Sequence, residues 1–114
     1  MAAAFITNLV INAYADFSAV FNLEDNDSGC PLNITGYQVF SQMRKHAGSS
    51  SVVSLGATIH NASNGQVRVG LSKTETGALK PGRYVYDVLV INTSGKTERV
   101  LEGMVLVKEG ATHS

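Results

Sequence analysis

The sequence has one cysteine, no tryptophan and few charged residues. With Cys30 as its single cysteine, the chain cannot form an intrachain disulfide, so nothing in it requires an oxidising compartment. Asp27 and Pro31 flank this cysteine closely and bring no positive charge that would activate a thiolate, so we do not expect a nucleophile there. Charged residues make up 16% of the chain, against about 25% in ordinary soluble domains. This low fraction indicates that neighbouring molecules cover part of the surface.

Net charge is also missing, because nine basic residues balance nine acidic ones. No long-range field therefore attracts nucleic acid or an anionic membrane, and we expect neither as a partner. No apolar run approaches the ~18 residues that a membrane-spanning helix needs. The apolar segment 2–11 has no Lys or Arg before or within it, and Thr7 and Asn8 interrupt it. A first β-strand explains this segment better than a secretory signal does.

What the sequence does contain is alternation of apolar and polar residues with a period of two, which is typical of half-buried strands. Loops rich in Asn, Asp, Ser and Gly separate these segments. The pattern predicts one domain over residues 1–114, an all-β, immunoglobulin-like antiparallel sandwich of about seven strands. The expected strands cover residues 5–11, 17–24, 37–45, 52–60, 66–71, 83–91 and 97–107.

One segment interrupts the strand pattern. Ser72 and Glu75 have the spacing of a helix capping box, so we expect a short helical turn near residues 72–79. The motif LKPGRYVYD follows over residues 79–87 and fits the corner that enters strand F of immunoglobulin-like domains. There Tyr84 would bond upstream backbone through its hydroxyl. Tyr86 occupies the position at which an antibody domain has its second cysteine.

Few residues are candidates for a catalytic or metal-binding site. His46, His60 and His113 lie far apart in sequence, and no paired-cysteine or zinc-ligand spacing is present. Residues 25–29 begin like a calcium loop, but position 12 of such a loop would be Gly36 instead of a bidentate Glu. Glu98 and Glu102 are better explained as solvated strand residues than as an acid–base pair. We therefore predict no enzyme activity, no catalytic residue, no metal site and no cofactor.

The last two predicted strands carry the one feature that indicates a function. Their inward set would be Tyr84, Tyr86, Val88, Val90, Leu101, Val105 and Val107, yet the opposite set is also apolar. An outward apolar patch on a sheet marks a surface for a partner protein. The alternative is that the short helix or the N-terminal strand covers it. The residues expected at this protein interface are Val85, Leu89, Ile91, Val100, Met104 and Leu106, and Phe40 is another outward apolar residue.

Several sequence blocks resemble small virion proteins of tailed bacteriophages, in particular phages of cyanobacteria. The blocks are residues 6–12, 15–18, 32–37, 42–50, 79–87 and 99–103. The chain is also similar to the N-terminal domain of phage baseplate upper proteins. This resemblance implies an immunoglobulin-like fold in a tail-tip assembly. Those proteins continue into a stalk or receptor-binding part, whereas this chain ends at Ser114, so we expect an adaptor or decoration module.

The resulting hypothesis is a non-enzymatic structural protein of a phage virion, in the tail, baseplate or tail-fibre attachment. It would be made in the host cytoplasm and bind other virion proteins through the outward face, while any open strand edge could pair with another chain. Self-association is an alternative, and the N-terminal strand could fold back or reach into a neighbour. A capsid or neck decoration protein is the second hypothesis. A carbohydrate-binding module is the third, and the lack of tryptophan disfavours it.

Overall fold

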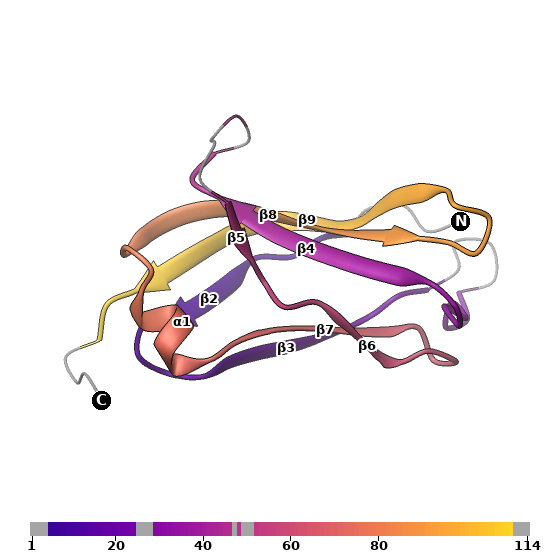
Figure 1. The fold of residues 1–114 in the computed structure, drawn as a ribbon, viewed down its shortest axis with the longest axis horizontal. Coiled ribbons are helices and arrows are strands. Elements are labelled where there is room, and N and C mark those ends of the chain that lie inside the picture. The colour runs from indigo at the N-terminus through magenta and orange to yellow at the C-terminus, as the bar shows by residue number, and fades with distance from the viewer. Residues whose placement is uncertain (1–4, 25–28, 47, 49–51, 111–114) are drawn as a thin grey trace.

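The computed structural model describes residues 5–24, 29–46, 48 and 52–110. Within these ranges the chain forms strands with one short helix between the seventh and eighth strands (Figure 1). The elements are β1 (Phe5–Ile6), β2 (Leu9–Asn12), β3 (Phe17–Asn22), β4 (Gln38–Arg44), β5 (Val52–Ser54), β6 (Thr58–Asn61), β7 (Gln66–Leu71), α1 (Lys73–Gly77), β8 (Gly82–Ile91) and β9 (Thr97–Lys108).

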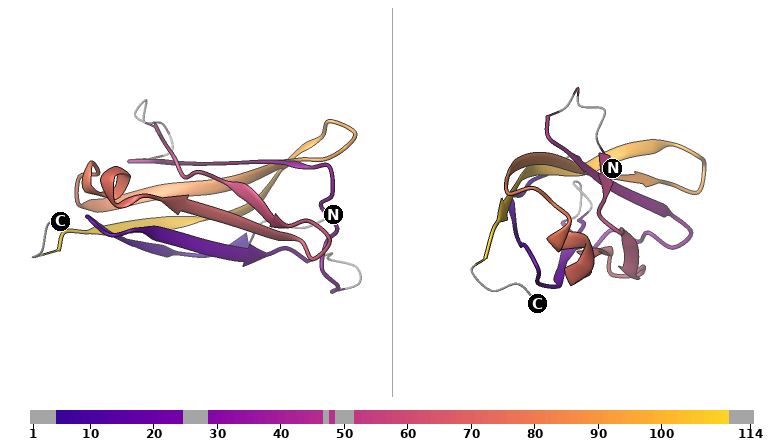
Figure 2. Two further views of the ribbon diagram at one scale, coloured as in Figure 1. Left: turned by 60° about the horizontal axis from the view of Figure 1, so that its bottom comes forward. Right: turned by 60° about the vertical axis from the view of Figure 1, so that its left-hand side comes forward.

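The strands form two sheets that pack face to face (Figure 2). The larger sheet has the order β1-β9-β8-β4-β5, with β2 also paired to β9, and the smaller one has the order β3-β7-β6. Strands β4, β8 and β9 correspond to C, F and G of an immunoglobulin domain, and β3, β7 and β6 correspond to B, E and D. The predicted immunoglobulin-like sandwich is therefore confirmed.

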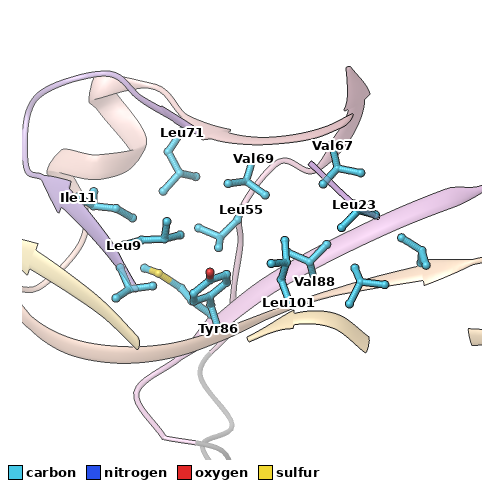
Figure 3. Packing of buried hydrophobic residues seen from close by; sticks show 14 of the residues in the cluster. Leu9, Ile11, Leu23, Leu55, Val67, Val69, Leu71, Tyr86, Val88 and Leu101 are labelled. Carbon is cyan, nitrogen blue, oxygen red and sulfur yellow. The ribbon is translucent and has the colours of Figure 1, made fainter. Parts of the chain in front are cut away.

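The core fills the space between the two sheets (Figure 3). The inward side chains of the central strands β7 and β8 are buried, as the alternation predicted, except that Tyr84 is half-buried. The most deeply buried apolar residues are Ile11, Leu23, Ile34, Met43, Leu55, Val67, Val69, Val88, Val90, Val100, Val105 and Val107.

The expected strand 52–60 is wrong as a single element. The chain leaves the larger sheet after β5 and enters the smaller sheet as β6. At the crossing, the Leu55 amide donates to the Ser41 carbonyl at 2.9 Å, and the Leu55 carbonyl accepts from the Gly70 amide at 2.7 Å. Gly56 follows with a φ of 60°, a conformation that costs little only for glycine. Leu55 therefore hydrogen-bonds to both sheets.

The expected N-terminal strand is divided at Thr7 and Asn8 into β1 and β2, which both run parallel to β9. At the break the Tyr86 hydroxyl donates to the Thr7 carbonyl at 2.6 Å, and the Met104 amide donates to Asn8 Oδ1 at 3.0 Å. A Cβ at Gly103 would overlap the Thr7 carbonyl. Glycine at position 103 thus allows the N-terminal segment to approach β9 closely.

The capping box and the tyrosine corner are confirmed. The Glu75 amide donates to Ser72 Oγ at 3.2 Å, and the Ser72 amide donates to Glu75 Oε1 at 2.9 Å. The helix α1 that they begin is shorter than the predicted 72–79 segment. The Tyr84 hydroxyl donates to the Lys80 carbonyl at 2.8 Å, which is the bond that the corner requires.

The prediction that Val100 points outward is wrong. Along the β8–β9 pair, Val88 lies opposite Leu101 but Leu89 lies opposite Arg99, so Val100 is the extra residue of a β-bulge. A bulge places two successive side chains on the same side and breaks the period of two. Val100 and Leu101 consequently both enter the core, with Val100 at 0% exposure.

Candidate docking face

The outer face of the larger sheet carries a set of exposed apolar side chains. Ile6 is 77% exposed, Phe40 51%, Val10 50%, Met104 49% and Leu106 37%. Val85, Leu89 and Ile91 are half-buried on the same face. Five of the six predicted interface residues therefore lie on this face, and Val100 does not.

Cross-strand register brings the residues near β2 together into a first apolar sector. Val10 of β2 lies opposite Leu106 of β9, and Met104 of β9 lies opposite Val85 of β8. Neighbours on one face of a sheet are close enough for their side chains to touch. The first apolar sector consists of Val10, Val85, Met104 and Leu106.

A second apolar sector lies toward the β8–β9 turn. Phe40 of β4 is directly opposite Leu89 of β8, and Ile91 is two residues further along β8 on the same face. Phe40 is half exposed and Leu89 beside it is half-buried. This sector therefore exposes an aromatic side chain next to the flatter surface of β8. The second apolar sector consists of Phe40, Leu89 and Ile91.

A charged band separates the two sectors. Arg99 Nε lies 3.2 Å from Asp87 Oδ2, and Arg99 Nη1 lies 3.9 Å from Glu102 Oε2. Asp87 and Glu102 are themselves opposite each other across β8 and β9. Together with Ile6, Val85, Leu89 and Met104, the band lines a shallow hollow in this face. The predicted patch is thus two apolar areas on either side of a central cluster of two acids and one base.

The outer face of the smaller sheet provides an internal comparison. Among the described residues of its three strands, Val20 is the one large apolar side chain on that face. Gln66 Nε2 donates to Asn22 Oδ1 at 2.9 Å there. The other outward side chains include Ser18, Thr58, His60 and Arg68. Within one sandwich, one outer face has the polar composition expected beside water and the other does not.

Neither segment that was expected as a cover lies over the apolar face. Strands β1 and β2 pair with β9 in the plane of the larger sheet and so extend its edge. In this structure they pair with β9 of the same chain. Helix α1 packs against β7 of the smaller sheet, where Lys73 N donates to Asp16 Oδ1 and the Thr76 hydroxyl donates to the Ala15 carbonyl, both at 2.8 Å.

The residues considered as metal ligands or as an acid–base pair do not form a site in the described part of the chain. Within the part of the chain that the structure describes, no group of three His, Cys, Asp or Glu residues is arranged to hold a metal ion. Residues 25–28 of the calcium-loop candidate, and His113, lie outside the described residues. Glu98 approaches Lys96 at 4.0 Å, whereas Glu102 approaches Arg99. Among the same residues, no helix has the length and apolar character to cross a membrane.

Tyr86 is buried beneath the N-terminal strands, and this burial affects its ionisation. Burial disfavours the charged phenolate and raises the pKa of Tyr86 to about 12. Its hydroxyl is already engaged with the Thr7 carbonyl. This tyrosine therefore has a structural role in holding the N-terminal strands.

No family model matches the chain, and no curated protein matches it. Among solved structures, the chain is similar to the N-terminal domain of ORF48 of phage TP901-1, with 19% identity and a TM-score of 0.56 over 91% of this chain and 85% of that one. The murine protein CRIg (13% identity, TM-score 0.44, 90% and 92% coverage) and the Listeria monocytogenes internalin-like protein lmo2027 (12% identity, TM-score 0.44, 94% and 28% coverage) are less similar. The likeness to the phage domain shows that the two chains share the sandwich fold.

Proposed function

We propose that this chain is a non-enzymatic structural module of a phage virion that docks on another virion protein through the outer face of its larger sheet. The observation that carries the proposal is the contrast between the apolar outer face of the larger sheet and the polar outer face of the smaller one. The shared fold with a phage protein domain supports the phage setting. So do the sequence blocks that resemble virion proteins of tailed phages, including those of cyanobacteria.

Affinity in this proposal comes from burying the two apolar sectors. A few large side chains usually dominate such an interface, and Phe40, Leu89 and Met104 are three of the large side chains in the two sectors. Truncating one of them would remove apolar area whose burial is worth roughly 25 cal/mol per Å². Val85, Ile91 and Leu106 complete the proposed contact, and Ile6 and Val10 extend it toward the N-terminal edge.

Specificity would come from the charged band. The charged band is a cluster of Asp87, Arg99 and Glu102. A docked partner that excludes water would have to donate hydrogen bonds to the carboxylate oxygens of this cluster that Arg99 leaves unpaired. A partner lacking a donor there would leave a buried carboxylate incompletely paired, which is costly. The charged band would therefore fix the register of a contact whose affinity is mainly apolar.

We place the module in the tail, baseplate or tail-fibre attachment, since the sequence resembles the N-terminal domain of baseplate upper proteins. The decisive measurement is cryo-electron microscopy of the intact particle, in which this domain is searched for in the density. Density at the baseplate or fibre junction with Leu89 and Met104 against another chain would agree with the proposal. A position on the capsid or neck would keep the structural role and refute the location.

Variants test the face directly. Leu89→Asp and Met104→Asp should fold yet fail to enter particles, because a carboxylate in an apolar contact loses its hydration. Thr58→Asp on the outer face of the smaller sheet is the matched control, since Thr58 is exposed and lies opposite Arg68, and it should be incorporated normally. Normal incorporation of both face variants would contradict the proposal.

A further inference from the structure

The smaller sheet ends in a strand with an open edge. In the order β3-β7-β6, strand β3 pairs with β7 on one side. Across residues 5–24, 29–46, 48 and 52–110, no strand pairs with its other side. In constant-type immunoglobulin domains the first strand lies beside strand B in this sheet. Both N-terminal strands of this chain pair with β9 instead, so the place beside β3 is left open.

The hydrogen-bond phase of β3 shows which groups face this edge. The Leu23 amide donates to the Gly65 carbonyl at 2.8 Å, and hydrogen-bonded pairs alternate along an antiparallel ladder. Phe17, Ala19 and Phe21 therefore bond to β7. Ser18, Val20 and Asn22 direct their amides and carbonyls away from β7, which leaves three donors and three acceptors in the spacing of a strand.

The side chains on β3 define what kind of strand fits. Phe17, Ala19 and Phe21 point toward the core but stay only half-buried, whereas Val67 and Val69 of the neighbouring β7 are at 0% exposure. A strand added beside β3 would place every second side chain over the open flank of these residues. Those side chains should be apolar, and the alternate ones should suit the exposed row of Ser18, Val20 and Asn22.

Charge selects against a second copy of the same chain. An antiparallel pair of β3 strands about a two-fold axis at Val20 would set Asp16 opposite Glu24 of the other copy, once at each end. Like charges directly opposite each other are destabilising, and acidic residues on an edge strand are a common guard against self-pairing. Basic residues at both ends of an incoming strand would instead be attracted, whichever way the strand runs.

We propose that the open edge of β3 accepts an extended strand of another protein, with alternating apolar side chains flanked by basic residues. The binding mode is strand addition, in which main-chain hydrogen bonds supply affinity and the alternate side chains supply specificity. This site lies on the smaller sheet, apart from the docking face of the larger one, and does not rest on the proposed virion role.

The test uses amide hydrogen exchange by NMR and a synthetic peptide of alternating valine and threonine with lysine at both ends. In the peptide-free protein, the amides of Ser18, Val20 and Asn22 should exchange fast, while those of Ala19 and Phe21 exchange slowly. Saturating peptide should slow exchange of the three edge amides by roughly tenfold or more, as closing an exposed amide into a ladder does. Glu24→Gln should weaken binding by about 2–5-fold, which is the range of an exposed ion pair.

Two controls separate strand addition from general adhesion. Val20→Pro removes the central edge donor without touching the β7 ladder and should abolish binding, whereas Val20→Thr keeps the donor and should bind like wild type. The same peptide N-methylated on every residue has no amide donor on either edge and should not bind, and this control needs no variant to fold. Equal binding of the N-methylated peptide, or unchanged edge amides at saturating peptide, would overturn the proposal. Concentration-dependent protection of these amides without peptide, together with a dimer mass, would show that a second copy occupies the edge and would also overturn it.

Discussion

Replacing Gly103 by alanine should loosen the N-terminal strands from β9. The added Cβ would overlap the Thr7 carbonyl, which is backbone and cannot turn aside like a flexible side chain. Gly103 has no positive φ, so the expected effect is a steric one. To make room, the segment around Thr7 would have to move away from β9.

The size of the effect follows from the contacts at that break. The Thr7 amide donates to the Glu102 carbonyl at 2.9 Å, and the Thr7 carbonyl accepts from the Tyr86 hydroxyl at 2.6 Å. Asn8 Oδ1 accepts from the Met104 amide at 3.0 Å. Each hydrogen bond is worth about 1 kcal/mol, and overpacking by one methyl costs about 1–3 kcal/mol. Alanine offsets about 0.4–1 kcal/mol by restricting the unfolded chain, so the loss of all three bonds together with the overpacking gives an expected net loss of about 3–6 kcal/mol.

The assay is urea unfolding of wild type and variant, with amide exchange at Thr7 as a local readout. Gly48→Ala is the control, because among the described residues a Cβ there would meet only His46 Nδ1, at an ordinary 3.8 Å. We expect that variant to match or slightly exceed wild type in free energy of unfolding. An unfolding free energy of Gly103→Ala within ~0.5 kcal/mol of wild type, with the Thr7 amide still protected, would refute the reasoning.

Three further predictions concern single side chains. The pKa of Tyr86 is raised to about 12, so its phenol stays protonated in the folded chain at a pH near 10, where the unfolded chain ionises. Its contribution to the free energy of unfolding should be complete below pH 10 and decline as the pH rises toward 12. Tyr86→Phe should remove that part of the pH dependence of unfolding. Ser72→Ala should cost about 1 kcal/mol in thermal or urea unfolding, because it removes the acceptor for the Glu75 amide at the start of α1; an unchanged stability would show that the cap is dispensable. Tyr84→Phe should cost about 0.5–1.5 kcal/mol by removing the bond to the Lys80 carbonyl, measured by the same unfolding curves, and no loss would mean that the corner is held by packing alone.

Local patterns predicted the elements of the fold well where each strand follows its own alternation. Residues 66–71 were predicted as a strand with the bounds that β7 has. The capping box at Ser72 and the tyrosine corner at Tyr84 depend on residues three or four positions apart. Such short-range interactions can be recognised in a sequence because both partners are near each other along the chain.

The candidate docking face was predictable only in part, for the same reason. The alternation identified Val85, Leu89, Ile91, Met104 and Leu106 as outward apolar residues. It did not identify Ile6 and Val10 as members of that face, because their sheet depends on pairing with β9, about a hundred residues away. Nor did it show that the Asp87–Arg99–Glu102 cluster divides the face, which follows from the register between β8 and β9.

The sequence by itself determined the fold class, the turns, the helix start and the apolar character of both faces of its last two strands, because these follow from local periodicity and from side-chain chemistry. Only the tertiary structure decided that Val100 belongs to the core, that the chain changes sheets at Leu55, and that β3 keeps an open edge. The physical reason is common to all three. Pairing partners, bulges and edges are set by hydrogen bonds and close contacts between distant segments, and the residue order of one strand contains no record of the strand beside it.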